Sequence, residues 1–345
     1  MKAVRIHEHG GVDKLRYEEA ENPRISSPNE VIVKLRAASV NHIDIWVRLG
    51  ATGIAIPMPH ILGGDGAGVI FEVGGEVSNV RPGDAVCLYL FSGCGQCEFC
   101  LSHRDFMCVY VRALGERLDG TYAEYVRLPA ENCFPIPAGM SFAEAAAFPL
   151  VFVTVWRMLI TNARLKPGET ILIIGIGGGV AGAALQVAKK IGANVIVTSG
   201  SDEKLELAKK YGAAHTINHR EKDFAQEVRA LTGNRGVDVV LDCVAGEVWQ
   251  KSLAALARGG RLVTCGATAG GSPETDLTPI FTKHLQIFGS TLGSRDEFRH
   301  LLSFMAVAEI KPIIDQVFPL SEAAAAQRRM EEAKQFGKIV LQISD

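Results

Sequence analysis

Two different rhythms of apolar and polar positions divide the chain. Up to about residue 130, short segments alternate between apolar and polar residues and are separated by Gly and Pro turns such as 81–84 (RPGD). This alternation is typical of half-buried strands, so it predicts an all-β domain of sandwich or barrel type. The segments with this pattern are 2–8, 30–40, 66–74, 84–90 and 123–129.

From residue 170 the pattern changes to predicted strands that are followed by loops and helices, the first of these loops being rich in glycine. Six apolar, β-branched segments recur, most of them separated by segments with helical periodicity. Continuous apolar strands of this kind are typical of parallel sheets that are covered on both faces. The pattern predicts an α/β doubly wound parallel sheet of Rossmann type. The expected strands are 170–175, 194–199, 215–219, 238–244, 261–266 and 285–291.

The length of 345 residues indicates two domains, because a single core rarely grows beyond ~250 to 300 residues. We expect residues 1–150 and 294–345 to form the β-rich catalytic domain, with the tail folding back onto the first domain. Residues 151–293 are expected to form the dinucleotide-binding domain.

Charge and hydropathy exclude several classes of partner. The chain has 36 Lys and Arg against 38 Asp and Glu, without a basic stripe, so nucleic acid is excluded as an expected partner. No apolar run approaches the ~20 residues that span a bilayer, and the N-terminal residues lack the apolar core of a signal peptide. We therefore expect a cytoplasmic enzyme acting on a small-molecule substrate.

The loop after strand 170–174 fits a dinucleotide-binding motif. Gly177, Gly179 and Gly182 match G-x-G-x-x-G between a strand and a helix, where backbone N–H groups can approach a pyrophosphate. Gly178 and Val180 complete the predicted phosphate-binding loop. The alternative is a tight strand-to-helix turn that binds no ligand.

The end of the second strand of this series bears on the choice of coenzyme. An NAD site normally has an Asp or Glu there, whereas this chain has Ser199, Gly200 and Ser201, with Lys204 a short turn away. The missing carboxylate favours NADP(H), although Asp202 keeps NAD possible. Gly266, at the end of the expected strand 261–266, is also expected to contact the coenzyme.

Half of the eight cysteines lie within residues 93–108. Cys94, Cys97, Cys100 and Cys108 have the spacing C-x2-C-x2-C-x7-C, and in a reducing compartment such clusters favour metal over disulfides. Four thiolates around Zn²⁺ form a closed tetrahedral site, which stabilises a loop and does no chemistry. The alternative is four free thiols.

Taken together, the β-rich half, the segment GGDGAGVIFEVG, the cysteine lobe and the closing FGKIVL resemble the medium-chain dehydrogenase/reductase family. This family includes zinc alcohol dehydrogenases and quinone oxidoreductases. The resemblance covers essentially the whole chain and implies a GroES-like catalytic domain, a Rossmann domain and one structural zinc per chain.

The resemblance also shows where the family's catalytic zinc ligands would stand. Asn41 occupies the position of the first Cys, Gly64 that of the His, Asp65 that of the Glu and Leu150 that of the second Cys. We therefore expect an active site without catalytic metal. An improvised site with open coordination, formed by His42, Asp44, His60 and Asp65, remains the alternative.

The remaining predicted site residues follow from this comparison. Asn41 is the expected hydrogen-bond donor to developing charge, with Asp44 orienting it; a buried amide that only connects two loops is equally compatible with the pattern. His42, Thr154 and Lys338 resemble family residues that contact the coenzyme.

Without zinc, acceptors that delocalise their own charge are expected to react most readily. The sequence thus favours an NADPH-preferring reductase of quinones or activated C=C bonds. One alternative is an alcohol or aldehyde dehydrogenase, and another is a dinucleotide-binding protein without useful turnover. Segment 285–291 is apolar, and relatives pair it across a two-fold axis, so we expect a homodimer or homotetramer.

Overall fold

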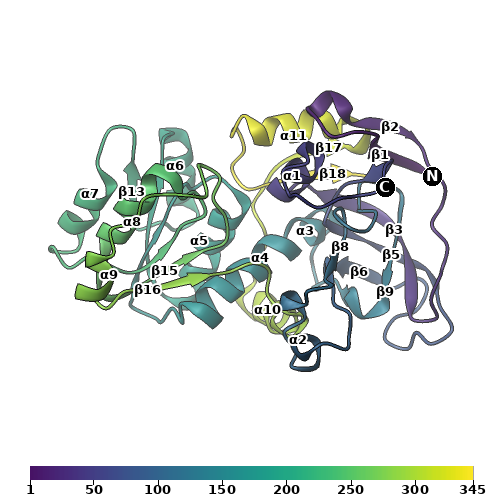
Figure 1. Cartoon of the computed structure of the whole chain (residues 1–345), viewed down its shortest axis with the longest axis horizontal. Helices are drawn as coiled ribbons and strands as arrows, with labels where there is room; N and C mark the ends of the chain where they lie inside the picture. Colours follow the sequence, from purple (N-terminus) through teal and green to yellow (C-terminus); the bar gives the residue numbers. More distant parts are fainter. Residues whose placement is uncertain (345) are drawn as a thin grey trace. The chain divides into compact units, whose positions relative to one another are not determined.

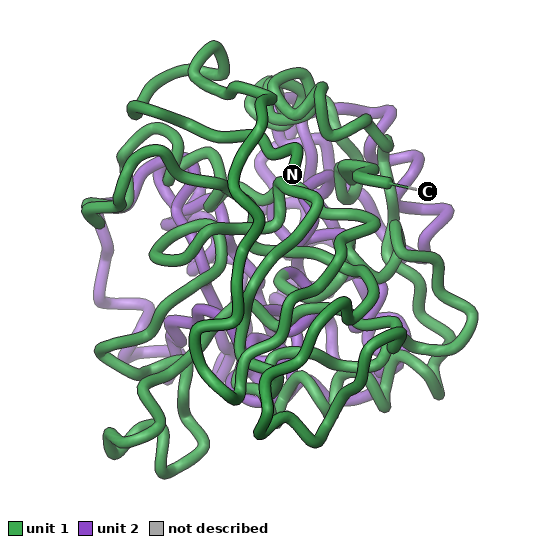
Figure 2. Tube along the Cα trace, turned by 90° about the vertical axis from the view of Figure 1, so that its right-hand side faces the viewer, with its two compact units in different colours: residues 1–150, 294–345 green, residues 151–293 purple. Residues whose placement is uncertain are grey.

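The computed structural model describes residues 1–344, and the chain divides into two compact units. Unit 1 contains residues 1–150 together with the residues from 294 onward, and unit 2 contains residues 151–293 (Figure 2). Unit 1 is thus assembled from two stretches that are far apart in the sequence.

A seven-stranded sheet forms the centre of unit 1 (Figure 1). Its order is β10-β6-β5-β3-β18-β17, with β9 also paired to β3. β3 (Glu30–Ser39) runs antiparallel to β5 (Asp65–Val73) and to β18 (Lys338–Gln342). Its apolar side chains Val31, Val33 and Leu35 are fully buried, so this strand lies in the core.

The other strands of unit 1 form the edges of this sheet and two smaller sheets. The smaller sheets have the orders β2-β1-β4 and β7-β8. Their bounds are β1 Lys2–Ile6, β2 Arg16–Glu19, β4 His60–Ile61, β6 Ala85–Leu88, β7 Phe91–Ser92, β8 Arg112–Ala113, β9 Tyr125–Pro129, β10 Cys133–Pro135 and β17 Ile314–Pro319. The helices of unit 1 are α1 His42–Leu49, α2 Glu98–Leu101, α3 Phe142–Ala147, α10 Arg295–Ala308 and α11 Ala323–Glu331.

Unit 2 is a six-stranded sheet with the order β13-β12-β11-β14-β15-β16, and every neighbouring pair in it is parallel. The strands are β11 Thr170–Ile173, β12 Asn194–Ser199, β13 His215–Asn218, β14 Val237–Leu241, β15 Leu256–Thr264 and β16 Gln286–Gly289. The helices are α5 Gly179–Ile191, α6 Asp202–Lys210, α7 Phe224–Leu231, α8 Trp249–Ala255 and α9 Thr278–Thr282, and α4 Pro149–Trp156 leads into the unit. The predicted fold class is confirmed.

Several of the predicted site residues lie at the beginnings of two helices. α1 begins directly after β3, with Asn41 as its N-cap, so His42 is the first residue of a helix and not part of a β-rich segment. α5 begins at Gly179 after the extended N-cap residue Gly178, and it ends at Gly192 with a left-handed φ of 90°. None of the helices in residues 1–344 combines the length and apolar character that a bilayer crossing requires.

Candidate functional site

The four cysteines of residues 93–108 converge on one point in unit 1. Their Sγ atoms all lie within 4.8 Å of one another, and Cys100 Sγ is 3.6 Å from Cys97 Sγ and 3.9 Å from Cys94 Sγ. A tetrahedral Zn²⁺ with Zn–S bonds of about 2.3 Å requires sulfur atoms about 3.8 Å apart. The arrangement fits a four-thiolate zinc site, as the spacing predicted.

This cysteine lobe rests on the start of α10. Arg295 Nε pairs with Asp105 Oδ2 at 3.1 Å, and His103 Nδ1 lies 3.3 Å from Asp296 Oδ2. Arg295 also pairs with Glu131. The lobe is therefore attached to the C-terminal stretch of unit 1 by charged contacts.

A second group of polar residues is buried at the junction of β3, β5 and β18. The carboxylate of Asp65 is fully buried: its Oδ1 accepts a hydrogen bond from Leu150 N, and its Oδ2 accepts from Ser39 Oγ at 3.0 Å and Asn41 Nδ2 at 2.9 Å. The ammonium of Lys338 lies 3.2 Å from the same oxygen. We call Ser39, Asn41, Asp65 and Lys338 the polar cluster.

The charge of Lys338 is held inside a cage of oxygen atoms. Its Nζ donates to Val40 O at 3.1 Å, to Asn41 Oδ1 at 2.5 Å and to Asp65 Oδ2 at 3.2 Å. Burial lowers the pKa of Lys338, whereas the three acceptors match the three N–H groups of an ammonium and favour its charged form. The predicted contact of Lys338 with the coenzyme remains a prediction.

Asn41 and Asp44 lie side by side, as predicted. The backbone N–H of Asn41 donates to Asp44 Oδ2 at 2.8 Å, and the hydroxyl of Tyr122 donates to the same oxygen at 3.0 Å. Burial raises the pKa of Asp44 to about 7 and that of Tyr122 well above its ordinary value. Asp44 therefore fixes the backbone from which the Asn41 side chain projects.

The two histidines of the predicted improvised metal site lie in different environments. His42 is exposed, and its ring is tilted by 48° to that of Trp46 with the centroids 6.2 Å apart, whereas His60 is buried with Nδ1 3.5 Å from Asp119. Within residues 1–344 the only group of three or more metal-binding side chains is the cysteine cluster. The structure therefore does not bring His42, Asp44, His60 and Asp65 together as a metal site.

In unit 2, the glycine loop connects β11 with α5. Gly177 has a φ of 132°, which favours glycine, and a Cβ at Gly178 would meet no atom within 4 Å. Gly178, Gly179 and Val180 form the first turn of α5, and none of them is fully buried. Open N–H groups at the start of a 13-residue helix are suited to bind a pyrophosphate.

At the end of β12, the structure adds one residue that the sequence analysis missed. Arg220 packs against Gly200, since a Cβ there would lie 2.6 Å from Arg220 Nε. Asp202 Oδ1 accepts a hydrogen bond from Asn218 Nδ2 at 2.9 Å, and Ser201 Oγ accepts from Lys204 N at 3.4 Å. Arg220 follows β13, so no local pattern around residues 199–204 could have identified it.

The other predicted coenzyme contacts occupy separate elements. Thr154 is buried in α4, Ser199 is buried at the end of β12, and Gly266 lies half-buried after β15. Ser39 and Tyr122 were not predicted as site residues, because a serine in a strand and a tyrosine in a loop carry no signal of their partners.

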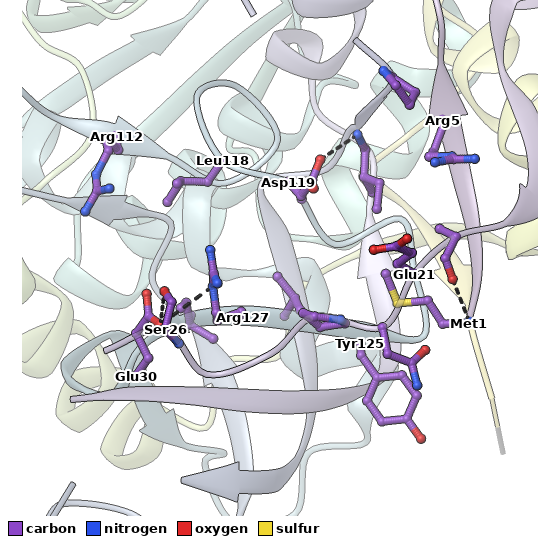
Figure 3. A pocket seen from close by; sticks show the side chains of 18 of the residues that line it. Met1, Arg5, Glu21, Ser26, Glu30, Arg112, Leu118, Asp119, Tyr125 and Arg127 are labelled. Atoms are coloured by element: carbon purple, nitrogen blue, oxygen red, sulfur yellow. Dashed lines mark hydrogen bonds and ion pairs between the residues drawn. The ribbon is translucent and has the colours of Figure 1, made fainter. Parts of the chain in front are cut away.

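Unit 1 has a pocket of about 520 Å³ (Figure 3). It is lined by residues of β1, β9 and the segment before β3, and several of its charged groups have partners. Glu30 accepts hydrogen bonds from Ser26 and lies 3.7 Å from Arg127, and Asp119 accepts from the backbone of Ile61. It contains none of the residues that the sequence analysis selected.

Comparisons with known proteins define the class of this protein. Residues 27–138 match the model of the alcohol dehydrogenase GroES-like domain, and residues 179–307 match that of the zinc-binding dehydrogenases. A zinc-type alcohol dehydrogenase-like protein of Schizosaccharomyces pombe is 35% identical, with 99% of each chain covered. An alcohol dehydrogenase of Geobacillus stearothermophilus is 36% identical over 95% of this chain and 96% of its own.

A solved structure of an NAD-dependent alcohol dehydrogenase superposes with a TM-score of 0.96 at 42% identity and covers all of both chains. The protein is an NAD(P)-dependent oxidoreductase. It belongs to the zinc-type alcohol dehydrogenase branch of the medium-chain dehydrogenase/reductase family.

These relatives overturn the predicted reaction. The sequence analysis favoured NADPH-preferring reduction of quinones or activated C=C bonds, and this prediction is wrong, because similar proteins along the full length are alcohol dehydrogenases, one of them NAD-dependent. The prediction assumed that a missing metal leaves no positive charge near the reacting oxygen. The sequence analysis named Lys338 as a coenzyme contact and did not connect it with Asn41 and Asp65.

Proposed function

We propose that this protein interconverts an alcohol and the corresponding carbonyl compound, with a nicotinamide dinucleotide as hydride carrier. The alcohol loses a hydride to the coenzyme and a proton to the surroundings, and reduction of the carbonyl reverses both transfers. The names of the full-length relatives support this reaction class. The alcohol substrate itself is not specified by them.

The family implies a catalytic zinc, but the side chains at its ligand positions do not fit one. Asn41, Gly64 and Leu150 offer no thiolate or imidazole, and both oxygens of Asp65 already accept hydrogen bonds. The ammonium of Lys338 lies among these oxygen atoms. We infer that it supplies the positive charge of this site.

The observation that carries the proposal is the direction of the Asn41 amide. Its Oδ1 accepts from Lys338, and one N–H of its Nδ2 donates to Asp65, so among residues 1–344 its second N–H has no partner. A cation on the amide oxygen polarises the amide and strengthens its N–H as a donor. That N–H is suited to stabilise the alkoxide-like oxygen of the substrate.

We also propose that the protein accepts both NAD(H) and NADP(H). The NAD-dependence named for a relative supports the first, and Arg220 beside Gly200 supports the second, because a guanidinium can bind a 2′-phosphate. Asp202, the carboxylate that follows Ser201, accepts a hydrogen bond from Asn218.

The proposal is tested by measuring the metal content of the protein and its turnover of alcohols. Protein purified without added metal should contain about one zinc per chain, matching the one four-cysteine site, and should oxidise members of a panel of primary and secondary alcohols with NAD⁺ or NADP⁺. A second tightly bound zinc would overturn the role of Lys338 while leaving the reaction class intact. Coenzyme binding without turnover of any alcohol or carbonyl would overturn the reaction class.

The variant Asn41→Leu tests the amide. We expect kcat to fall by about 10²- to 10³-fold, the usual effect of removing one donor to an oxyanion, with the coenzyme Kd unchanged. Asn79→Leu is the matched control, since Asn79 is an amide of the same unit that donates to Ala130 O. Equal kcat values for the two variants would contradict the proposed role.

A further inference from the structure

Two cysteines outside the zinc lobe lie in contact in unit 2. The Sγ atoms of Cys243 and Cys265 are 3.3 Å apart, and both residues are half-buried. They follow the neighbouring parallel strands β14 and β15, each two residues beyond the paired residues Leu241 and Val263. They therefore stand opposite each other at the carboxyl edge of the sheet.

This geometry suits a covalent bond between the two sulfur atoms. Neighbouring strands lie about 4.8 Å apart, and a disulfide spans Cα atoms separated by about 4.4 to 6.8 Å. The sulfur atoms would need to approach by about 1.2 Å to reach the S–S bond length of about 2.05 Å. A shift of that size needs no change in strand register.

The backbone around the pair is held on both sides. Cys243 O accepts from Thr268 N at 3.3 Å, and Ala269 N donates to Val244 O at 2.9 Å, so the loops after the two strands are tied together. Ala245, two residues after Cys243, has the strained φ of 54°. Because ligands of doubly wound sheets bind outside the carboxyl ends of the strands, these loops belong to the coenzyme side of unit 2.

We propose that Cys243 and Cys265 are a redox-modification site, which a hydroperoxide converts to a disulfide, and that this disulfide weakens coenzyme binding. In the first step a cysteine thiolate attacks the peroxide, giving a sulfenic acid and water or an alcohol. In the second step the other thiol attacks the sulfenic sulfur, forming the S–S bond and releasing water. The two thiols lose two electrons and two protons, and the peroxide is reduced.

The surroundings of Cys243 disfavour its thiolate. The contact with the sulfur of Cys265 and burial raise the pKa of Cys243, and the fully buried carboxylate of Asp242, directly before it, adds to this effect. The disulfide that forms is the same whichever of the two sulfurs is oxidised first.

The test uses the zinc-loaded protein treated with hydrogen peroxide and then digested without reductant. We expect a cross-linked peptide pair containing Cys243 and Cys265, reversed by dithiothreitol, with the zinc content unchanged. The Kd for NADH, measured by fluorescence, should rise by at least about fivefold, the low end of typical coupling between sites. Coenzyme bound beforehand should slow the reaction.

Two variants keep the proposal falsifiable. Cys243→Ser should lose both the cross-link and the peroxide effect on Kd, whereas Cys87→Ser, a buried thiol that donates to Phe134 O in unit 1, should retain both. The site is refuted if peroxide leaves the pair reduced or converts the two sulfurs separately to sulfinic acids. A cross-link that leaves the Kd unchanged would refute the regulatory part. None of these outcomes depends on which alcohol the enzyme oxidises.

Discussion

A buried carboxyl group such as Asp44 couples the stability of unit 1 to pH. Burial raises its pKa to about 7, whereas in the unfolded chain an Asp titrates near 3.9. At a pH between these two pKa values, Asp44 of the folded protein keeps a proton that the unfolded chain has released. The contribution of Asp44 to the free energy of unfolding is therefore greatest on the acid side and decreases as the pH rises from about 4 to about 7.

We predict that Asp44→Asn removes this dependence. The amide oxygen can still accept from Asn41 N and Tyr122 Oη, so the fold should persist. The difference in free energy of unfolding, variant minus wild type, should increase by up to about 2 to 3 kcal/mol between pH 5 and pH 8, at about 1.4 kcal/mol per pKa unit. Urea denaturation at both pH values measures it; Asp13→Asn, at an exposed position of the same unit, is the control. Parallel changes in all three proteins would disprove the prediction.

Arg220 gives a second prediction at the scale of single residues. Arg220→Ala should weaken NADP(H) binding by about 10- to 100-fold, because a hydrogen bond to a charged group is worth about 1.5 to 3 kcal/mol. NAD(H), which has no 2′-phosphate, should bind as before. Fluorescence titration of both coenzymes measures the effect, with Lys222→Ala as control, since Lys222 is paired with Glu227. An equal loss for both coenzymes would contradict the assignment.

Residue identities alone did not show how the polar cluster is connected. The sequence analysis named Asn41, Asp44 and Lys338, yet Lys338 is separated from Asn41 by 297 positions. Their contact depends on β18 pairing with β3, and the contact of Ser39 with Asp65 depends on the register between β3 and β5. Pairings of this kind are set by tertiary packing, which a single sequence does not express.

The cysteine lobe is an element that its own residues cannot hold together by apolar packing. Leu101, Val109 and Tyr110 are each exposed by two thirds or more, so the lobe buries little hydrophobic surface. A segment without a core depends on metal for its order. Because all four ligands lie within 16 residues, this site could be predicted from spacing alone, unlike the polar cluster.

We therefore predict that Cys100→Ser releases zinc and loosens only this element. Amide hydrogen exchange should accelerate in residues 93–108, while β11 to β16 of unit 2 keep the protection of the wild type. Elemental analysis and exchange mass spectrometry measure the two effects. Cys133→Ser, at a buried thiol in β10, should retain zinc and serves as the control. Uniform loss of protection throughout the chain would show that the lobe does not unfold independently.

For the whole molecule, the edge of the parallel sheet is the feature with the widest consequence. β16 is the last strand of the order in unit 2, and Ile287 on it is 39% exposed. Unpaired edges with apolar side chains invite pairing with another chain. We propose that two copies join their β16 strands across a two-fold axis.

The prediction is that Ile287→Lys shifts the particle mass toward the 37.1 kDa of a single chain. Repulsion between two symmetry-related lysines at the joined edge should prevent pairing. Light scattering after size exclusion gives the mass. Val317→Lys, at a half-exposed position on β17, which ends the sheet of unit 1, is the matched control. An unchanged oligomer with Ile287→Lys would exclude this edge as the interface.

The position of β18 also governs the order in which the molecule can be completed. A ribosome releases residues 151–293 in full before it reaches Lys338, so unit 2 can fold while the sheet of unit 1 still lacks a central strand. Until β18 arrives, residues 37–39 of β3 lack a partner on the side where β9 pairs with residues 30–34, and Asp65 lacks the ammonium of Lys338. β18 thus both completes the sheet beside β3 and brings a cation to its buried carboxylate, after every residue of unit 2 has been synthesised.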